Sequence, residues 1–167
     1  MVPAYLVSLL TRQVALLQRD GFLKKHPSPW LIWEPGNWDP PRSPAESDAG
    51  ATRLPDPKRP DRPGAGDALC FELLSKEPDH LFKIGRSSDC EIVLNDMTIS
   101  REQFHLEHKA GKWTLVPITN ANTEMFGKPV TAPVELTRES PLKVGHLTLT
   151  FSPAGDFANR LAKLLKT

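Results

Sequence analysis

The sequence predicts a mainly β protein built around an antiparallel β-sandwich, and three observations lead to this fold class. After Asp67, short apolar runs alternate with turns rich in Gly, Pro, Asn and Asp at intervals of roughly ten residues, which is the strand spacing of a sandwich. Within residues 103–108, Phe104, Leu106 and His108 share one face of an extended chain, and polar residues share the other. The length of 167 residues, with 39% hydrophobic and 25% charged residues, suits one soluble domain with appendages.

Residues 1–34 are predicted to form an amphipathic helix followed by a short apolar strand. Apolar residues recur at helical spacing between Tyr5 and Leu17, and Gly21 supplies a stop signal. A helix packed on its own domain is the simpler interpretation, and a helix that binds a partner is the alternative. Trp30-Leu31-Ile32-Trp33 is too short for a helix and has the composition of a strand.

The rest of the chain divides into three predicted parts. Residues 35–66 contain eight prolines among Asp, Arg, Ser and Gly, a composition that cannot bury enough apolar area to offset chain entropy, and they are predicted to be a disordered or extended linker. The sandwich is predicted over residues 67–152. Ser152 and Pro153 resemble an N-cap followed by proline at the first helical position, and an apolar stripe predicts a closing helix over 153–167.

Several function classes are disfavoured by composition. A net charge of +1 gives no basic surface for nucleic acid. Cys70 and Cys90 lie in separate apolar runs and are predicted to be buried thiols, and no histidine has metal-ligand spacing, so neither a metal nor a cofactor is expected. Asp89, Glu91 and Asp96 are expected at solvent-facing positions with no acid–base pair among them, which predicts that the chain is not an enzyme.

The N-terminal apolar run carries no membrane or export signal. Arg12 and Gln13 interrupt it well short of the ~20 residues that a bilayer span requires. It also lacks the basic segment and small-residue cleavage site of a signal peptide. A cytoplasmic protein without a membrane partner is therefore expected.

Motifs in residues 81–151 point to a known family. Gly85-Arg86 ends one predicted strand, Ser100-Arg101 follows the next acidic-apolar strand, and Trp113 begins a later one, all at that family's spacing. The late residues that match its pattern are Leu136, Leu142, Val144 and Gly145. The stretch resembles the forkhead-associated (FHA) domain, which implies a β-sandwich that docks phosphothreonine peptides, here in a protein expected to be bacterial.

The resemblance implies a phosphopeptide site carried on loops. Arg86 would offer the phosphate a planar fork of donors, Ser100 would donate its hydroxyl, and Arg101 would add a second charge-assisted contact. Gly85 would permit a tight backbone path. The turn residues expected to contact the peptide backbone or shape the threonine pocket are Thr119, Asn120 and Asn122.

Two departures from the family pattern affect this site. Gln103 stands where the family has a histidine that braces the binding loops, and its amide can still donate and accept hydrogen bonds. If Thr123 keeps its family position as a supporting residue, Ala121 replaces the family's asparagine. A shift by one residue would let Asn120 or Asn122 serve instead, and both registers stay open.

The leading hypothesis is a phosphothreonine-dependent adaptor or signalling module whose partners are threonine-phosphorylated proteins, which implies a serine/threonine kinase in the same cell. The alternative is a scaffold of this fold that binds partners independently of phosphate, through its sheet surface or its N-terminal helix. A third hypothesis places an enzyme or nucleic-acid site in residues 1–34, where His26, Trp30 and Trp33 lie together, although aromatic clusters are more often core.

Overall fold

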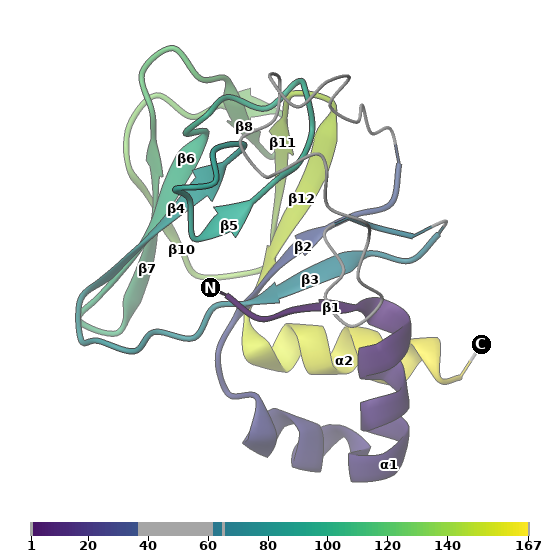
Figure 1. Ribbon diagram of the computed structural model, residues 1–167. Coiled ribbons are helices and arrows are strands. Elements are labelled where there is room, and N and C mark those ends of the chain that lie inside the picture. The colour runs from purple at the N-terminus through teal and green to yellow at the C-terminus, as the bar shows by residue number, and fades with distance from the viewer. Residues whose placement is uncertain (1, 37–61, 65, 167) are drawn as a thin grey trace.

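A computed structural model describes residues 2–36, 62–64 and 66–166, and it shows two β-sheets with two helices packed against one of them (Figure 1). The first sheet has the strand order β1 (Ala4–Leu6), β3 (Leu69–Glu72), β2 (Trp30–Trp33), β12 (Leu147–Ser152), β11 (Ser140–Val144), β8 (Thr123–Met125) and β9 (Lys128–Pro129). The second has the order β10 (Val134–Leu136), β7 (Lys112–Pro117), β6 (Phe104–Lys109), β4 (His80–Gly85) and β5 (Ile92–Val93). The helices are α1 (Val7–Lys25) and α2 (Ala154–Leu164). This architecture confirms the predicted mainly β fold with a helix toward each end.

Strand β2 is buried on both faces and lies inside the first sheet. It pairs with β3 on one side and β12 on the other. Trp30 and Ile32 contact the helices, whereas Leu31 and Trp33 face the second sheet. A strand covered on both faces must be apolar throughout, which explains its continuous hydrophobic run.

The N-terminal segment therefore contributes strands to the sheet that contains β3. The sequence predicts residues 1–34 as a part separate from the sandwich at 67–152, whereas in the structure β1 and β2 both pair with β3, and Trp33 lies opposite Leu69. Most of the predicted linker at 35–66 lies outside the described residues.

Helix α1 differs from its predicted form in its length and in a break. It continues past Gly21 to Lys25, and Gln18 interrupts it with φ 62° and ψ 169°. At its start, the Ser8 N–H donates to one Asp67 carboxylate oxygen at 2.9 Å and the Ser8 hydroxyl donates to the other at 2.6 Å. A carboxylate distant in sequence thus satisfies a donor at the positive end of the helix.

Helix α2 is attached to the first sheet by an ion pair. Two guanidinium nitrogens of Arg160 donate to the two oxygens of Glu34 at 2.6 and 2.7 Å, and the Thr150 hydroxyl donates to Glu34 at 2.7 Å. The predicted capping role of Ser152 is not observed, because Pro153 occupies the N-cap position and Ser152 is buried in β12.

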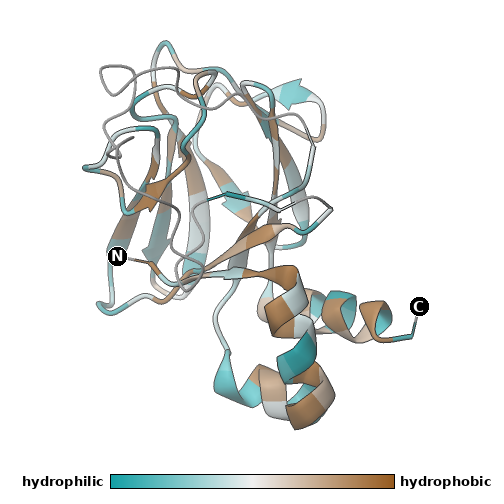
Figure 2. Ribbon diagram, turned by 45° about the vertical axis from the view of Figure 1, so that its right-hand side comes forward, coloured by the Kyte–Doolittle hydropathy of each residue, from teal (hydrophilic) through white to brown (hydrophobic). Residues whose placement is uncertain are grey.

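Two apolar cores follow from this layering. One fills the space between the sheets, and the other lies between the first sheet and the helices. Figure 2 shows hydrophobic residues in strands of both sheets and along the helices. Both cysteines are buried free thiols, as predicted. Neither described helix is long and apolar enough to cross a bilayer.

Candidate functional site

The loop after β4 lies against the loop between β5 and β6. The Arg86 N–H donates to the Ser100 carbonyl at 2.9 Å, and the Ser87 N–H donates to the Arg101 carbonyl at 3.1 Å. A Cβ on Gly85 would lie 2.1 Å from the Arg101 carbonyl oxygen, so only glycine allows this close approach. The backbone thus brings Arg86 and Ser100, from two separate loops, to the same place.

The Arg86 side chain is oriented by the same pair of loops. It is half-buried, and its Nε donates to the Ile99 carbonyl at 3.1 Å. This bond anchors the guanidinium base next to Ser100, which is also half-buried, while Arg101 is exposed. Two arginines and one hydroxyl therefore lie on adjoining turns, a donor set suited to an anion.

The buried thiol of Cys90 supports the same junction. Its Sγ donates to the Arg101 carbonyl at 3.3 Å. Burial, with a smaller effect from Glu102, raises the pKa of Cys90 to about 11, so the thiol keeps the proton that it donates. Sequence reasoning missed this contact because a single cysteine in an apolar run predicts burial but not a partner.

Gln103 connects this junction to the loop between β7 and β8. Its Oε1 accepts from the Ser100 N–H at 3.0 Å, while its Nε2 donates to the Asn122 carbonyl at 2.7 Å and to the Thr123 hydroxyl at 3.2 Å. Gln103 is only 1% exposed. The backbone partners fix the amide orientation, because an N–H can only donate and a carbonyl can only accept. All three loops therefore share one buried side chain.

The turn between β7 and β8 presents its polar residues at the surface. Thr119, Asn120 and Asn122 are exposed, and Asn120 has a left-handed backbone with φ 70°, which asparagine tolerates better than most residues. The Ala121 N–H donates to the Ile118 carbonyl at 3.1 Å and closes the turn.

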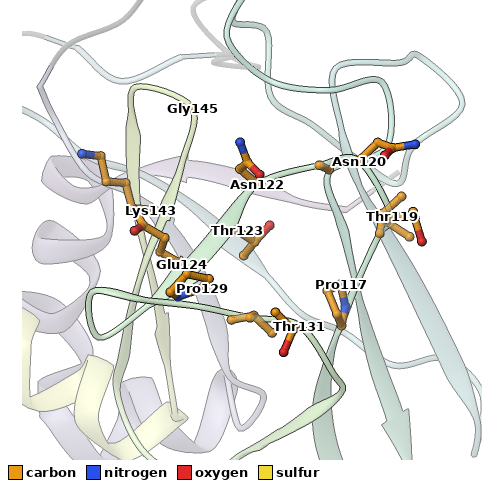
Figure 3. A pocket seen from close by; sticks show the side chains of 13 residues that line it. Pro117, Thr119, Asn120, Asn122, Thr123, Glu124, Pro129, Thr131, Lys143 and Gly145 are labelled. Carbon is orange, nitrogen blue, oxygen red and sulfur yellow. The ribbon is translucent and has the colours of Figure 1, made fainter.

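A pocket of about 670 Å³ opens beside this turn. In Figure 3, Pro117, Thr119 and Asn120 lie on the β7 side, with Asn122 and Thr123 on the side of β8. The residues that line it but were not predicted as site residues include Glu124, Thr131 and Lys143. Arg86, Ser100 and Arg101 do not line this pocket. The six predicted binding residues therefore form two groups, three at the junction of the first two loops and three at the pocket.

Asp96 corrects one expectation from the sequence, because its carboxylate is fully buried rather than solvent-facing. It accepts hydrogen bonds from the N–H of Thr98, at 2.8 Å, and from the Thr98 hydroxyl. That hydroxyl in turn accepts from the His146 N–H at 2.9 Å. A Cβ on Gly145 would lie 2.4 Å from the same hydroxyl, so this contact also requires a glycine. The β11–β12 turn is thereby fixed to the loop that carries Ser100.

The other acidic residues near the site have different surroundings. Asp89 is exposed, and a carboxylate oxygen of Glu91 lies 2.6 Å from Nε2 of His80. Within residues 2–36, 62–64 and 66–166, no group of three or more His, Cys, Asp or Glu side chains is arranged to hold a metal.

Replacing Gln103 should weaken both the fold and the loop arrangement. Gln103→Ala leaves the Ser100 N–H and the Asn122 carbonyl without their partner, and we expect a loss of about 2 kcal/mol in the free energy of unfolding. Gln103→Glu keeps the shape but places a carboxylate oxygen against the Asn122 carbonyl, so it should cost more than alanine. Urea unfolding of both variants measures this, and a glutamate variant as stable as wild type would contradict the assigned brace.

Comparison with known proteins identifies the family of the part of the chain that carries the three loops. Residues 72–155, half of the sequence, match the family described as the inner membrane component of T3SS, cytoplasmic domain. The matched residues run from the end of β3 into α2 and include the three loops described above. Among curated proteins, none matches the chain.

Solved structures similar to the chain include several FHA domains. The N-terminal FHA domain of Rad53p from S. cerevisiae, in complex with a phosphothreonine peptide, is 21% identical, with 52% of this chain and 78% of that chain covered and a TM-score of 0.42. The FHA domain of CT664 from Chlamydia trachomatis is 13% identical, with 75% and 97% covered and a TM-score of 0.48. An FHA domain of an Arabidopsis thaliana hypothetical protein is 19% identical, with 74% and 84% covered and a TM-score of 0.44.

Proposed function

The chain belongs to the family of the cytoplasmic domain of the T3SS inner membrane component, a domain of the FHA type, and from this premise we propose that it is a phosphothreonine-dependent protein-interaction module. It acts as an adaptor or signalling domain rather than as an enzyme, and its partners are threonine-phosphorylated proteins produced by a serine/threonine kinase. A cytoplasmic location belongs to the same proposal.

One observation carries the proposal: the Arg86 N–H donates to the Ser100 carbonyl at 2.9 Å, and Gln103 links Ser100 to the turn at Asn122. A phosphate ester needs a fixed cation and short donors held on a rigid frame. In this proposal Arg86 and Ser100 hold the phosphate, and Arg101 adds a second cation. The remaining contacts, to the peptide backbone or around the threonine, come from Thr119, Asn120 and Asn122, with support from Gly85, Gln103 and Thr123.

The glutamine at position 103 is compatible with this role. The family's histidine braces the binding loops, and here a side-chain amide makes three hydrogen bonds between the same loops. Phosphate recognition depends on where the donors are held rather than on which side chain holds them.

Arg86→Ala should lower phosphothreonine-peptide affinity by about 100-fold, because two charge-assisted hydrogen bonds of about 1.5 kcal/mol each are lost. Arg86→Lys should recover only part of this affinity, since a lysine lacks the planar fork. Binding is measured by fluorescence anisotropy with peptides selected from a phosphothreonine library, each paired with its unphosphorylated form.

Arg138→Ala is the matched control. Arg138 is an exposed arginine whose guanidinium lies over the Phe126 ring at 4.7 Å, and it lines no part of the proposed site. It should bind as wild type does. Equal binding by wild type and Arg86→Ala would overturn the proposal, and equal affinity for phosphorylated and unphosphorylated peptides would instead support the phosphate-independent scaffold.

A further inference from the structure

The outward face of α1 carries two exposed leucines. Leu9 is 47% exposed and Leu16 is 85% exposed, and the exposed Arg12 lies between them at positions i, i+3 and i+7 of one helix face. The opposite face buries Leu10 and Val14 against the sheet and α2. A helix at the surface of a monomer usually keeps its leucines on one face, so two exposed leucines on the opposite face indicate a second contact.

The structure holds this face in a defined position. The stripe begins close to the Ser8 N–H that Asp67 caps, and it ends at Gln18, whose φ of 62° and ψ of 169° lie in a region used almost only by glycine. Directly after the break, the Arg19 Nε donates to Asn159 of α2. The stripe is about two helical turns long, and the contacts to Asp67 and Asn159 lie at its two ends.

The exposed charges of the two helices indicate the chemistry of the partner. Arg19 pairs with Asp20 at 2.8 Å. The remaining exposed charged residues of α1, α2 and the two residues after α2 are five cations, Arg12, Lys24, Lys25, Lys163 and Lys166, against one carboxylate, Asp156. Two copies of this surface would repel each other in a symmetric dimer, where each patch meets itself. An acidic partner is attracted to it.

We propose that the stripe formed by Leu9, Arg12 and Leu16 docks an acidic amphipathic helix of a partner protein. The two leucines pack into its apolar face as ridges into grooves, and Arg12 pairs with a carboxylate between its apolar residues. Exposed Ala15 beside the stripe is small and allows close helix approach. A bilayer suits this surface less well, because an interfacial helix buries a broad apolar face, whereas this face offers two leucines, one on either side of an arginine.

This site is independent of the proposed phosphopeptide site. The two lie toward opposite ends of β12, which runs from the turn at Gly145 to Ser152, immediately before α2. A protein with both sites would hold one partner permanently on α1 and bind a second partner at the loops only when that partner is phosphorylated.

The test uses a displayed library of helical peptides with leucines seven residues apart and Glu, Gln or Lys midway between them. Wild type should enrich the Glu peptides, and Arg12→Glu should reverse the preference toward Lys. Leu16→Ser should weaken binding of the enriched peptides by about tenfold or more. An 85% exposed side chain can be replaced without disturbing the fold, and thermal unfolding of the variant verifies this.

Leu81→Ser is the matched control, since Leu81 is 40% exposed on β4 of the second sheet and should leave peptide binding unchanged. The proposal is overturned if no Glu preference appears, or if Leu16→Ser and Leu81→Ser behave alike. It is also overturned if anionic phosphatidylglycerol vesicles bind in a Leu16-dependent manner while no peptide is enriched. Arg86→Ala should retain helix binding, which separates this result from failure of the phosphopeptide proposal.

Discussion

Gly85→Ala should abolish phosphopeptide binding and destabilise the protein by about 3 kcal/mol, the cost of overpacking a close backbone contact. The added Cβ would lie 2.1 Å from the carbonyl oxygen of Arg101 and 2.8 Å from its carbonyl carbon. Both are backbone atoms, so no side chain can rotate away. The loop carrying Ser100 must move, and the hydrogen bond between Arg86 and Ser100 is broken.

Gly155→Ala provides the control for this variant. Gly155 lies in the first turn of α2, has no positive φ, and has no atom within 4 Å of an added Cβ. Alanine there should raise the free energy of unfolding by about 0.5 kcal/mol, because it lowers the conformational entropy of the unfolded chain and has a higher helix propensity than glycine. Urea unfolding and peptide anisotropy on both variants test the contrast, and a Gly85 variant that retained full affinity would show that the loops need not meet so closely.

The elements that the sequence predicted well are those fixed by local signals. Alternating apolar residues around Phe104 and Leu106 predict β6 because a half-buried strand needs that period. The Gly85-Arg86 and Ser100-Arg101 motifs mark two loops, and the structure places these loops in contact; their role in binding stays a prediction.

What could not be predicted depends on contacts between distant residues. The run at Trp30–Trp33 predicts a strand, but not its partners. These are β3, more than thirty residues later in the sequence, and β12, near the end of the chain. Composition alone cannot assign such pairings. Helix α1 likewise depends on Asp67 for its cap.

The site shows the same limit. Asp96 has the sequence surroundings of an exposed turn residue, and it is buried because Thr98 donates to it and the turn at Gly145 covers the pair. The role of Gln103 could be anticipated only as a brace of uncertain geometry, since its partners are a backbone N–H and a backbone carbonyl on two different loops. Nearly every residue has the same backbone N–H and carbonyl, so the sequence does not indicate which of them a side chain will bond.

Trp30→Ala should be the most destabilising single change in the helical layer, with a loss of about 4 kcal/mol in the free energy of unfolding. Trp30 is fully buried, and its ring lies 4.7 Å from Phe157, 5.5 Å from His26 and 6.3 Å from Phe22. Truncation leaves a cavity where β2, α1 and α2 meet, and it removes aromatic contacts that add to simple burial.

Trp30→Phe separates the contribution of the ring from that of its polar atom. The indole Nε1 is buried without a hydrogen-bond partner among the described residues, so phenylalanine removes an unsatisfied donor while keeping an aromatic ring. We expect a cost of about 1 kcal/mol, far below that of alanine. Equal losses for the two variants in urea unfolding would show that ring packing does not hold this layer together.

Phosphopeptide affinity should distinguish this layer from the binding loops. β12 is six residues long, so Trp30, opposite Ser152, lies roughly 20 Å along the strand from the turn at Gly145. At a temperature where Trp30→Ala remains folded, it should bind phosphothreonine peptides as wild type does, whereas Gly85→Ala should not. A Trp30 variant that was folded but unable to bind would mean that the helices help to position the loops, and the two ends of the sandwich would then have to be treated as one coupled unit.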